Sequence, residues 1–439
     1  MDRIESVAVQ MAELRLARYF GTVLSIRAGL IRVGGLNARA SVGDRVRIAL
    51  TEGTVFAEIV GLASRHAEVL PEGAIDGLSV GAEVELMGAP RIAPCDAWIG
   101  RIVDPFGQPL DGRPLAHGQM PRPFRCEAPL AIGRKRLGPR LATGLAVFDT
   151  LLPLVRGQRI GLFAGSGVGK STLLSEMARE VEADVIVIAM IGERGRELRE
   201  FVERTLGPDG MARAVIVTAT SDRSPLLRRR CAWAAMAVAE HFRDQGRHVL
   251  LLADSITRFA EAHREIALAA GEPPSFRGFP PSVSNLVMAL AERAGPGPEG
   301  AGDITAIFSV LVAGSDMEEP IADILRGTLD GHVVLDRTIA ERGRFPAVDI
   351  VRSVSRALPD AADAAENVMI ARARAALGVY AESELMIRAG LYAPGPDPRL
   401  DEAVRLYPQL DNFASLRTAS VAESFTALGR ALQMPAARK

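Results

Sequence analysis

The chain has 439 residues, enough for about three domains, and its 48% hydrophobic and 24% charged residues are typical of globular proteins. Its net charge of −1 argues against a generally basic nucleic-acid-binding protein. The three cysteines stand far apart without a C-x-x-C pair, which argues against a disulfide framework or a zinc site and fits a reducing compartment. Asp2 and Glu5 put negative charge where a secretory signal carries positive charge. Apolar runs such as 185–191 are too short to span a bilayer. We therefore expect a cytoplasmic protein that reaches a membrane only through partners.

Residues 1–18 are predicted to form a short helix, because Ile4, Val7, Met11 and Leu14 recur at spacings of three and four and make one apolar stripe. The apolar stripe fits two interpretations equally well. The helix packs on its own domain, or it is an arm that docks a partner helix.

Short alternating runs punctuated by glycine fill residues 19–90 and predict a small β-barrel. The predicted strands are Thr22–Ile26, Leu30–Val33, Arg45–Ala49, Val55–Val60, Ala67–Leu70 and Glu83–Met87. Phe56 is one of very few aromatic residues in this unit, so the unit is poorly suited to stacking on nucleic-acid bases.

Residues 91–130 are rich in Pro and Gly and are predicted to be a connecting segment, after which strands alternate with helices as a mainly parallel sheet requires. The predicted strands are 158–164, 184–190, 213–219, 247–253, 303–311 and 331–336, and the predicted helices are 170–182, 195–206, 224–244, 255–269 and 283–294. Further helices are predicted at 363–390, 398–415 and 418–433. The predicted fold is α/β, with a barrel over 19–90, a core over 91–365 and a C-terminal helical domain over 366–439.

The stretch Gly161-Leu-Phe-Ala-Gly-Ser-Gly-Val-Gly-Lys-Ser-Thr172 lies between an apolar run and an apolar-periodic segment, which is the strand–loop–helix context of a phosphate loop. Glycines let backbone N–H groups surround an anion, and the following helix directs its positive end there. The side chain of Lys170 would reach the phosphates and the hydroxyl of Ser171 would bind Mg²⁺. The disfavoured alternative is a structural glycine turn, and Ala164 stands where the consensus usually has its first glycine. The predicted nucleotide contacts are Gly165, Ser166, Gly167, Val168, Gly169, Lys170, Ser171 and Thr172.

Two carboxylates follow buried apolar strands and are candidates for the chemistry. Asp254 ends the run 249–253, where phosphate-loop enzymes carry the second acid of the Mg²⁺ site; the alternative is a cap for the next helix. Glu193 follows the run 185–191 at the sheet edge where ligands bind, and it is the best-placed base for the attacking water; the alternative is a first-turn Glu favoured by the helix dipole. Arg194 would meet γ-phosphate oxygens or belong to a solvated ion-pair network.

Two positions late in the core and one basic run are weaker signals. An arginine supplied across a subunit boundary would stabilise the transition state, but spacing alone does not single out Arg356 among the many arginines. Phe345 would stack on adenine or belong to the core. The run Arg228-Arg229-Arg230 is interpreted as a solvated or ion-paired helix face rather than a nucleic-acid patch.

Together these motifs resemble one family. FAGSGVGKST, IGERGRE, LLLADSITRFA, GFPPSVSNL, IADILRGTLDGHVVLDR and FPAVDIVRSVSR are similar to the ATPases of flagellar and type III protein export, relatives of the catalytic subunits of rotary ATP synthases. The resemblance covers nearly the whole chain and fits the flagellar branch best. It implies a β-barrel, a RecA-type phosphate-loop NTPase core with a mainly parallel sheet, and a helical C-terminal domain, assembled as a homohexameric ring.

The resemblance also implies roles for single residues. Lys170 and Ser171 become phosphate and Mg²⁺ contacts, Glu193 the general base, Arg194 a γ-phosphate contact in cis, and Asp254 the second acid of the metal site. Arg356 becomes the finger that reaches the neighbour's site, and Phe345 takes the place of an adenine-stacking aromatic. The 1–18 arm becomes the contact for a coiled-coil, stator-like regulator. The chain departs from the family at Ala313-Gly-Ser-Asp316, where an acidic residue, Gly and paired Asp are common, so the role of this loop is open.

The leading hypothesis is a Mg²⁺-dependent ATPase with ATP as its nucleotide, working at the inner-membrane export apparatus. Its expected partners are export-gate components, a central stalk protein, and exported substrates with their chaperones, but not nucleic acid. Alternatives are a virulence-type secretion ATPase, a catalytic subunit of a rotary proton or sodium ATPase, an RNA translocase and a nucleotide-binding scaffold. An RNA translocase would need a barrel rich in basic and aromatic residues. A protein that only binds nucleotide as a scaffold would not need the catalytic candidates that this chain carries together, which are Lys170, Glu193, Asp254 and Arg356.

Overall fold

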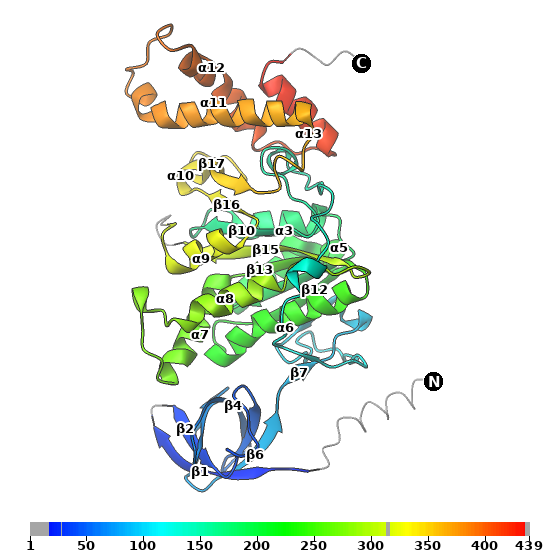
Figure 1. Ribbon diagram of the computed structural model, residues 1–439, viewed down its shortest axis with the longest axis vertical. Coiled ribbons are helices and arrows are strands. Elements are labelled where there is room, and N and C mark those ends of the chain that lie inside the picture. The colour runs from blue at the N-terminus through cyan, green and yellow to red at the C-terminus, as the bar shows by residue number, and fades with distance from the viewer. Residues whose placement is uncertain (1–16, 28, 313–316, 435–439) are drawn as a thin grey trace.

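The computed structural model describes residues 17–27, 29–312 and 317–434. A β-barrel stands at one end of the long axis, a sheet flanked by helices fills the middle, and three helices cover the other end (Figure 1). This arrangement confirms the predicted fold class. Among the described residues, no helix is both long enough and apolar enough to cross a membrane.

The N-terminal barrel closes in the strand order β1-β2-β5-β4-β3-β6. Alternate residues of each strand point inward and form a core of small aliphatic side chains, as the sequence pattern predicts. Most of the predicted helix over 1–18 lies outside the described residues; Ala17 and Arg18 are not helical, and Arg18 Nε forms an ion pair with Glu85 Oε1 at 2.5 Å. The six strands are β1 (Phe20–Arg27), β2 (Leu30–Gly34), β3 (Arg45–Ala49), β4 (Thr54–Leu62), β5 (Ala67–Pro71) and β6 (Glu83–Gly88).

The central sheet has the strand order β17-β16-β10-β15-β13-β11-β12-β8, with β17 antiparallel to β16 and the strands from β16 to β8 parallel to their neighbours in this order. The predicted strands of the core agree with the structure within one or two residues. These strands are β10 (Arg159–Ala164), β11 (Val185–Ile191), β12 (Ala214–Ala219), β13 (His248–Asp254), β15 (Asp303–Leu311) and β16 (Gly331–Leu335), and β17 spans Val348–Ser355.

The predicted connecting segment 91–130 is more than a linker, because it supplies the edge strand β8 (Arg101–Val103), which pairs with β12. Three residues are too few for an alternation pattern to reveal a strand in a Pro- and Gly-rich stretch. The remaining short elements are β7 (Arg91–Ile92), η1 (Asp96–Trp98), β9 (Arg122–Pro123), η2 (Ala131–Gly133), η4 (Phe276–Gly278) and β14 (Gly295–Pro296).

Helices cover both faces of the sheet, and the continuous apolar runs of its strands reflect burial on both sides. Val185, Val187 and Ala189 of β11 pack towards α6–α9, while Ile186 and Ile188 pack towards α2 and α3. The predicted helix 195–206 is regular only at first and then continues as the π-helical turn η3. The helices are α2 (Ala146–Asp149), α3 (Lys170–Glu180), α4 (Gly195–Glu200), η3 (Phe201–Leu206), α5 (Gly207–Met211), α6 (Pro225–Asp244), α7 (Ile256–Ala269), α8 (Ser282–Glu292), α9 (Pro320–Thr328) and α10 (Arg337–Glu341).

The C-terminal helices α11 (Ala364–Arg388), α12 (Pro398–Phe413) and α13 (Val421–Ala431) lie where helices are predicted. Their buried side chains belong to the same apolar cluster as α2 and α3, so this domain is joined to the core by packing. Arg374 of α11 also donates a hydrogen bond of 2.8 Å to the carbonyl oxygen of Ser353 in β17.

The run Arg228–Arg230 is ion-paired, which is one of the two forms that the sequence interpretation left open; Arg229 and Arg230 are not solvated. Arg229 Nη2 donates to Glu58 Oε1 of the barrel at 2.5 Å, and Arg230 pairs with both Glu58 and Glu72. Arg228 pairs with Glu265 at 3.0 Å. Because Arg229, Arg230 and Glu58 are buried, this cluster ties the barrel to α6 and is not a surface for nucleic acid.

Candidate active site

The candidate site lies at the carboxyl edge of the central sheet, where four neighbouring strands end. β10 leads into the glycine-rich loop, and its neighbour β15 leads towards residues 313–316, which lie outside the described residues. β13 follows next and ends at Asp254, and β11 ends two residues before Glu193. Parallel strands therefore bring together residues that are up to 89 positions apart in sequence, from 165 to 254.

The glycine-rich loop has the backbone that an anion site requires. Gly167 and Gly169 have φ values of 77° and 87°, in the region that favours glycine, and α3 begins at Lys170 directly afterwards. The N–H groups of the first helical turn and the helix dipole are thus directed at the loop. Val168 is buried and anchors the loop on the core.

Phe345 lies against this loop. A Cβ atom on Gly169 would stand 3.3 Å from two atoms of the Phe345 ring. The ring is 51% exposed, so it is not a core residue and offers a face for stacking. The structure thus brings Phe345 to the loop from a position 176 residues further along the chain, 345 against 169.

Asp254 is the centre of a small buried cluster behind the loop. Lys170 Nζ forms an ion pair with its Oδ1 atom, and Ser309 Oγ of β15 donates to the same atom at 2.6 Å. A pocket at this place is lined by Ser171, Glu193 and Asp254, among other residues. These are the hydroxyl and carboxylate oxygens that Mg²⁺ prefers, so the donor set fits a magnesium ion beside a nucleotide phosphate.

Glu193 is 6% exposed and lies in the same pocket. Burial, the nearby charge of Asp254 and a hydrogen bond with Glu197 raise the pKa of Glu193 to about 7. A carboxylate with such a pKa can accept a proton near neutral pH more readily than an ordinary glutamate. This is the property expected of a general base.

Arg258 of α7 is a site residue that the sequence interpretation missed. Its Nε atom lies 3.3 Å from Glu193 Oε1, and the positive charge opposes the rise in the pKa of Glu193. Its position in the sequence could have indicated this role, because Arg258 stands four positions after Asp254, in the first turn of the helix that follows the same strand. Ser309, on a neighbouring strand, gave no such signal.

Arg194 follows Glu193 but is directed away from the protein. Its side chain is 79% exposed and its Nη1 atom lies 3.6 Å from Glu197 Oε1. The structure therefore places Arg194 at the rim of the site.

Arg356 is not brought to this site, because it lies at the opposite edge of the sheet. Its backbone N–H donates to the carbonyl oxygen of Asp330 at 3.0 Å, and Asp330 pairs with Arg159 at the start of β10. The six residues of β10 span about 20 Å at the usual rise of ~3.3 Å per residue, which separates Arg356 from the glycine-rich loop at the other end. The side chain is exposed, and its Nη2 atom donates to Arg326 O at 3.1 Å.

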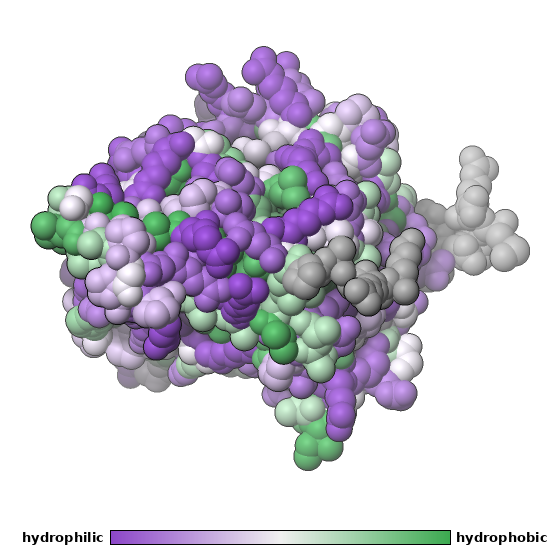
Figure 2. All heavy atoms as spheres, turned by 90° about the horizontal axis from the view of Figure 1, so that it is seen from above, coloured by the Kyte–Doolittle hydropathy of each residue, from purple (hydrophilic) through white to green (hydrophobic). Residues whose placement is uncertain are grey.

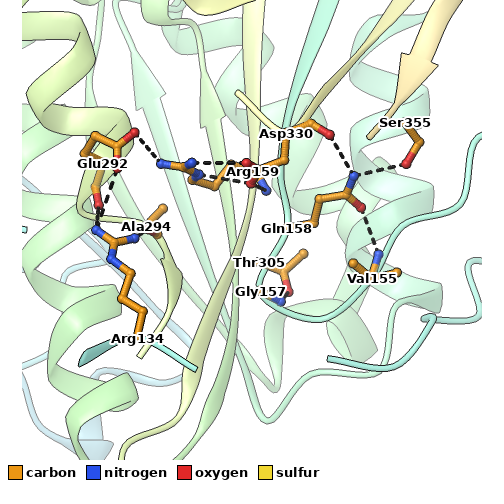
Figure 3. Close-up of polar contacts among 10 residues, drawn as sticks. All are labelled: Arg134, Val155, Gly157, Gln158, Arg159, Glu292, Ala294, Thr305, Asp330 and Ser355. Carbon is orange, nitrogen blue, oxygen red and sulfur yellow. Dashed lines mark hydrogen bonds and ion pairs between the residues drawn. The ribbon is translucent and has the colours of Figure 1, made fainter. Parts of the chain in front are cut away.

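A polar network fixes the backbone on which Arg356 is carried (Figure 3). The buried Gln158 donates from Nε2 to Asp330 O and to Ser355 Oγ, each at 3.0 Å, and its Oε1 atom accepts from Val155 N. Ser355 precedes Arg356 in sequence. The network therefore holds the end of β17 on the start of β10.

The fold and site define a nucleotide-binding ATPase core of the ATP synthase type, and the comparisons with known proteins agree. Residues 144–355 match the ATP synthase alpha/beta family, nucleotide-binding domain, and residues 362–429 match the T3SS EscN ATPase C-terminal domain. The chain belongs to the family of flagellum-specific ATP synthases and type III secretion ATPases. It is therefore an ATPase of the flagellar and type III export family.

Three known proteins illustrate the likeness. The flagellum-specific ATP synthase of Caulobacter vibrioides is 46% identical over 425 residues, which cover 94% of this chain and 96% of the relative. The assembled ATPase EscN of the enteropathogenic E. coli type III secretion system has a TM-score of 0.88 at 36% identity, covering 94% of this chain and 100% of that one. EscN in complex with its central stalk EscO has a TM-score of 0.84 at 36% identity and the same coverage.

Proposed function

We propose that this chain is a Mg²⁺-dependent ATPase that energises export of flagellar proteins, with each active site shared by two subunits of a homohexameric ring. The observation that carries the shared site is the course of β17. This strand starts beside the phosphate loop, just after Phe345, and ends at the far edge of the sheet, just before Arg356. One subunit would thus supply the base contact to its own nucleotide and the arginine to its neighbour's.

The residues divide the chemistry as follows. The phosphate loop from Gly165 to Thr172 and Lys170 hold the triphosphate, and Ser171 and Asp254 would hold Mg²⁺, which neutralises charge on the phosphates. Glu193 accepts a proton from the attacking water. Arg194 at the rim contacts a γ-phosphate oxygen when nucleotide binds. Arg356 of the neighbouring subunit stabilises the charge that develops in the transition state.

The flagellar assignment rests on the degree of identity. The flagellum-specific ATP synthase of Caulobacter vibrioides is 46% identical, whereas the type 3 secretion system ATPase of Xanthomonas euvesicatoria is 41% identical. The match of residues 362–429 to the T3SS EscN ATPase C-terminal domain favours export over a rotary proton or sodium ATPase. The protein would work in the cytoplasm at the inner-membrane export apparatus, together with export-gate components, exported proteins and their chaperones, and residues 1–18 would dock a stator-like coiled-coil regulator.

The turn between α11 and α12 is the proposed contact for a central stalk. Leu385 and Leu391 are 83% and 73% exposed there, and Met386 lies between them. Figure 2 looks onto the C-terminal helices and shows apolar side chains at the left margin, on the side where this turn lies in Figure 1. An exposed apolar tip fits a partner helix, and EscN has been solved with its central stalk.

Mixing two inactive variants tests the shared site. Lys170→Ala should lose phosphate binding and Arg356→Ala should lose the finger, so each protein alone should be inactive. In a mixed ring, about a quarter of the interfaces would pair an intact Lys170 with an intact Arg356 of the neighbour, so activity should return in part. No activity in the mixture, although both variants assemble, would contradict the shared site.

The export function needs a separate test. Cells that lack their own flagellar export ATPase should regain motility and secretion of flagellar proteins when they make this chain, but not when they make Glu193→Gln. Rescue of a virulence-type secretion system instead would point to the other branch, and co-purification with a membrane rotor and a second ring subunit would favour the rotary ATPase.

A further inference from the structure

The loop that carries Phe345 is closed by the side chain of the residue before it. Arg344 Nη1 donates to Pro346 O at 3.2 Å, and Nη2 donates to Val348 O at 2.7 Å. Both carbonyl groups lie just after Phe345 in the chain. The guanidinium group thus spans the backbone from 344 to 348, with Phe345 inside the span.

A residue of the C-terminal domain holds this guanidinium group in place. Asp411 of α12 forms an ion pair with Arg344, with 2.9 Å between Oδ1 and Nε. The Arg344 side chain is 11% exposed and that of Asp411 is 38% exposed, so the guanidinium group is largely shielded from solvent while the carboxylate remains accessible to water. Figure 1 shows α10 and β17, which flank the loop, directly beside the C-terminal helices.

Phe345 depends on such support because its own packing is weak. The ring is 51% exposed, so burial in the core does not fix its direction. Its position against Gly169 follows instead from the course of the backbone between α10 and β17. A backbone held in one arrangement lowers the entropic cost of presenting the ring for stacking when nucleotide binds.

We propose that Arg344 and Asp411 are positioning residues for the base-stacking ring of Phe345, so that the C-terminal helical domain sets the affinity for the nucleotide base. The inference rests on the proposed role of Phe345 at the base. It assigns no contact between Arg344 or Asp411 and the nucleotide itself.

A matched control lies in the same loop. Arg342 pairs with Glu384 of α11 at 2.6 Å and therefore also bridges the core and the C-terminal domain. Its guanidinium group donates to Tyr407 Oη at 3.5 Å rather than to the backbone around Phe345. Glu384→Gln should therefore remove an ion pair between the domains without releasing Phe345.

The test compares binding of MgADP with binding of magnesium tripolyphosphate, which has no base, by calorimetry on the full chain. Asp411→Asn should weaken MgADP binding about three- to tenfold, as expected if the competent loop arrangement falls to between a third and a tenth of the population. Binding of tripolyphosphate should not change, and Glu384→Gln should change neither. Arg344→Ala should have an effect at least as large as Asp411→Asn on MgADP alone.

Phe345→Ala separates this inference from the proposed function. It should weaken MgADP about five- to hundredfold, the range of aromatic stacking on a base, and Asp411→Asn should have no further effect in that background. If Phe345→Ala does not weaken MgADP, the base contact is wrong and the inference is wrong with it. If Phe345→Ala acts but Asp411→Asn does not, or acts equally on tripolyphosphate, only the positioning role is overturned.

Discussion

Arg258 Nε lies 3.3 Å from Glu193 Oε1, so the expected general base has a cation beside it as well as the anion of Asp254. Nε is buried and meets no hydrogen-bond acceptor of good geometry among the described residues. The interaction is therefore mainly electrostatic. Burial and Asp254 raise the pKa of Glu193, Arg258 lowers it, and the balance leaves it at about 7.

The pH dependence of turnover should report this balance. Only the ionised form of Glu193 can accept a proton, so kcat/KM, which reports the groups of the nucleotide-free enzyme, should rise with pH and reach half its maximum near the pKa of about 7. Steady-state hydrolysis between pH 5.5 and 8.5 measures it, with a stability check at each pH. Glu193→Gln should bind nucleotide but lose about 10²–10⁴ in turnover. Near-normal hydrolysis by that variant would rule out Glu193 as the base.

Removing Arg258 should shift the same profile in a known direction. Without the cation, the charged form of Glu193 is less favoured, so its pKa rises and the acid limb of kcat/KM moves to higher pH. Arg258→Ala should therefore be most impaired below pH 7. Arg264→Ala is the control on the same helix, since its guanidinium lies over the ring of Phe279 and not beside Glu193. A limb that stays in place in Arg258→Ala would show that the arginine does not act on Glu193.

Glu197 should act in the opposite direction. Its hydrogen bond with Glu193 raises the pKa of Glu193, because the bond favours the protonated form of the Glu193 carboxyl group. In Glu197→Gln an amide N–H can donate to the Glu193 carboxylate instead, which favours the charged form. The acid limb of kcat/KM should move to lower pH, and a shift to higher pH would contradict the assigned contact.

Most of the fold and the position of the phosphate loop could be predicted from local sequence. Buried strands and amphipathic helices have periodic patterns, and the glycine-rich loop has a fixed spacing. The edge strand β8 could not be predicted, because three residues are too few to show a periodic pattern. The residues of β17 are part of a family motif, but their sequence does not predict a strand. The domain boundaries and the roles of the site residues stay predictions.

The contacts that connect distant segments could not be predicted. The hydrogen bond between Ser309 and Asp254 joins residues 55 positions apart, from 254 to 309. The ion pair between Asp411 and Arg344 joins residues 67 positions apart, from 344 to 411. A single sequence gives no sign of such pairs. The sequence also gives no indication that Phe345 and Arg356 lie far apart in the fold. They are close in sequence, and only the antiparallel course of β17 shows that they serve opposite edges of the sheet.

The network around Gln158 should matter for turnover more than for nucleotide binding. Gln158→Leu would leave the buried Val155 N–H without its acceptor, while Asp330 O keeps the bond from Arg356 N and Ser355 Oγ keeps its bond to Pro153 O. The free energy of unfolding should fall by about 1–3 kcal/mol. It should also loosen the segment that carries Arg356 and so lower kcat, while MgADP affinity stays unchanged because the phosphate loop is at the other end of β10. The exposed Gln245→Leu is the control for the chemical change. Equal losses in kcat and in ADP affinity would indicate general disruption rather than a displaced finger.

The junction between the barrel and the core should depend on one buried carboxylate. Glu58→Ala would leave Arg229 and Arg230 without their shared partner, and breaking a buried ion pair on one side costs about 3–5 kcal/mol. Arg230 keeps its contact with Glu72, so the lower part of that range is expected. Urea unfolding followed by circular dichroism measures the change, and limited proteolysis should show faster cleavage within residues 91–130. Glu341→Ala removes the exposed pair with Arg337 and should change stability by less than about 1 kcal/mol. Equal effects of the two substitutions would mean that Glu58 does not hold the barrel on α6.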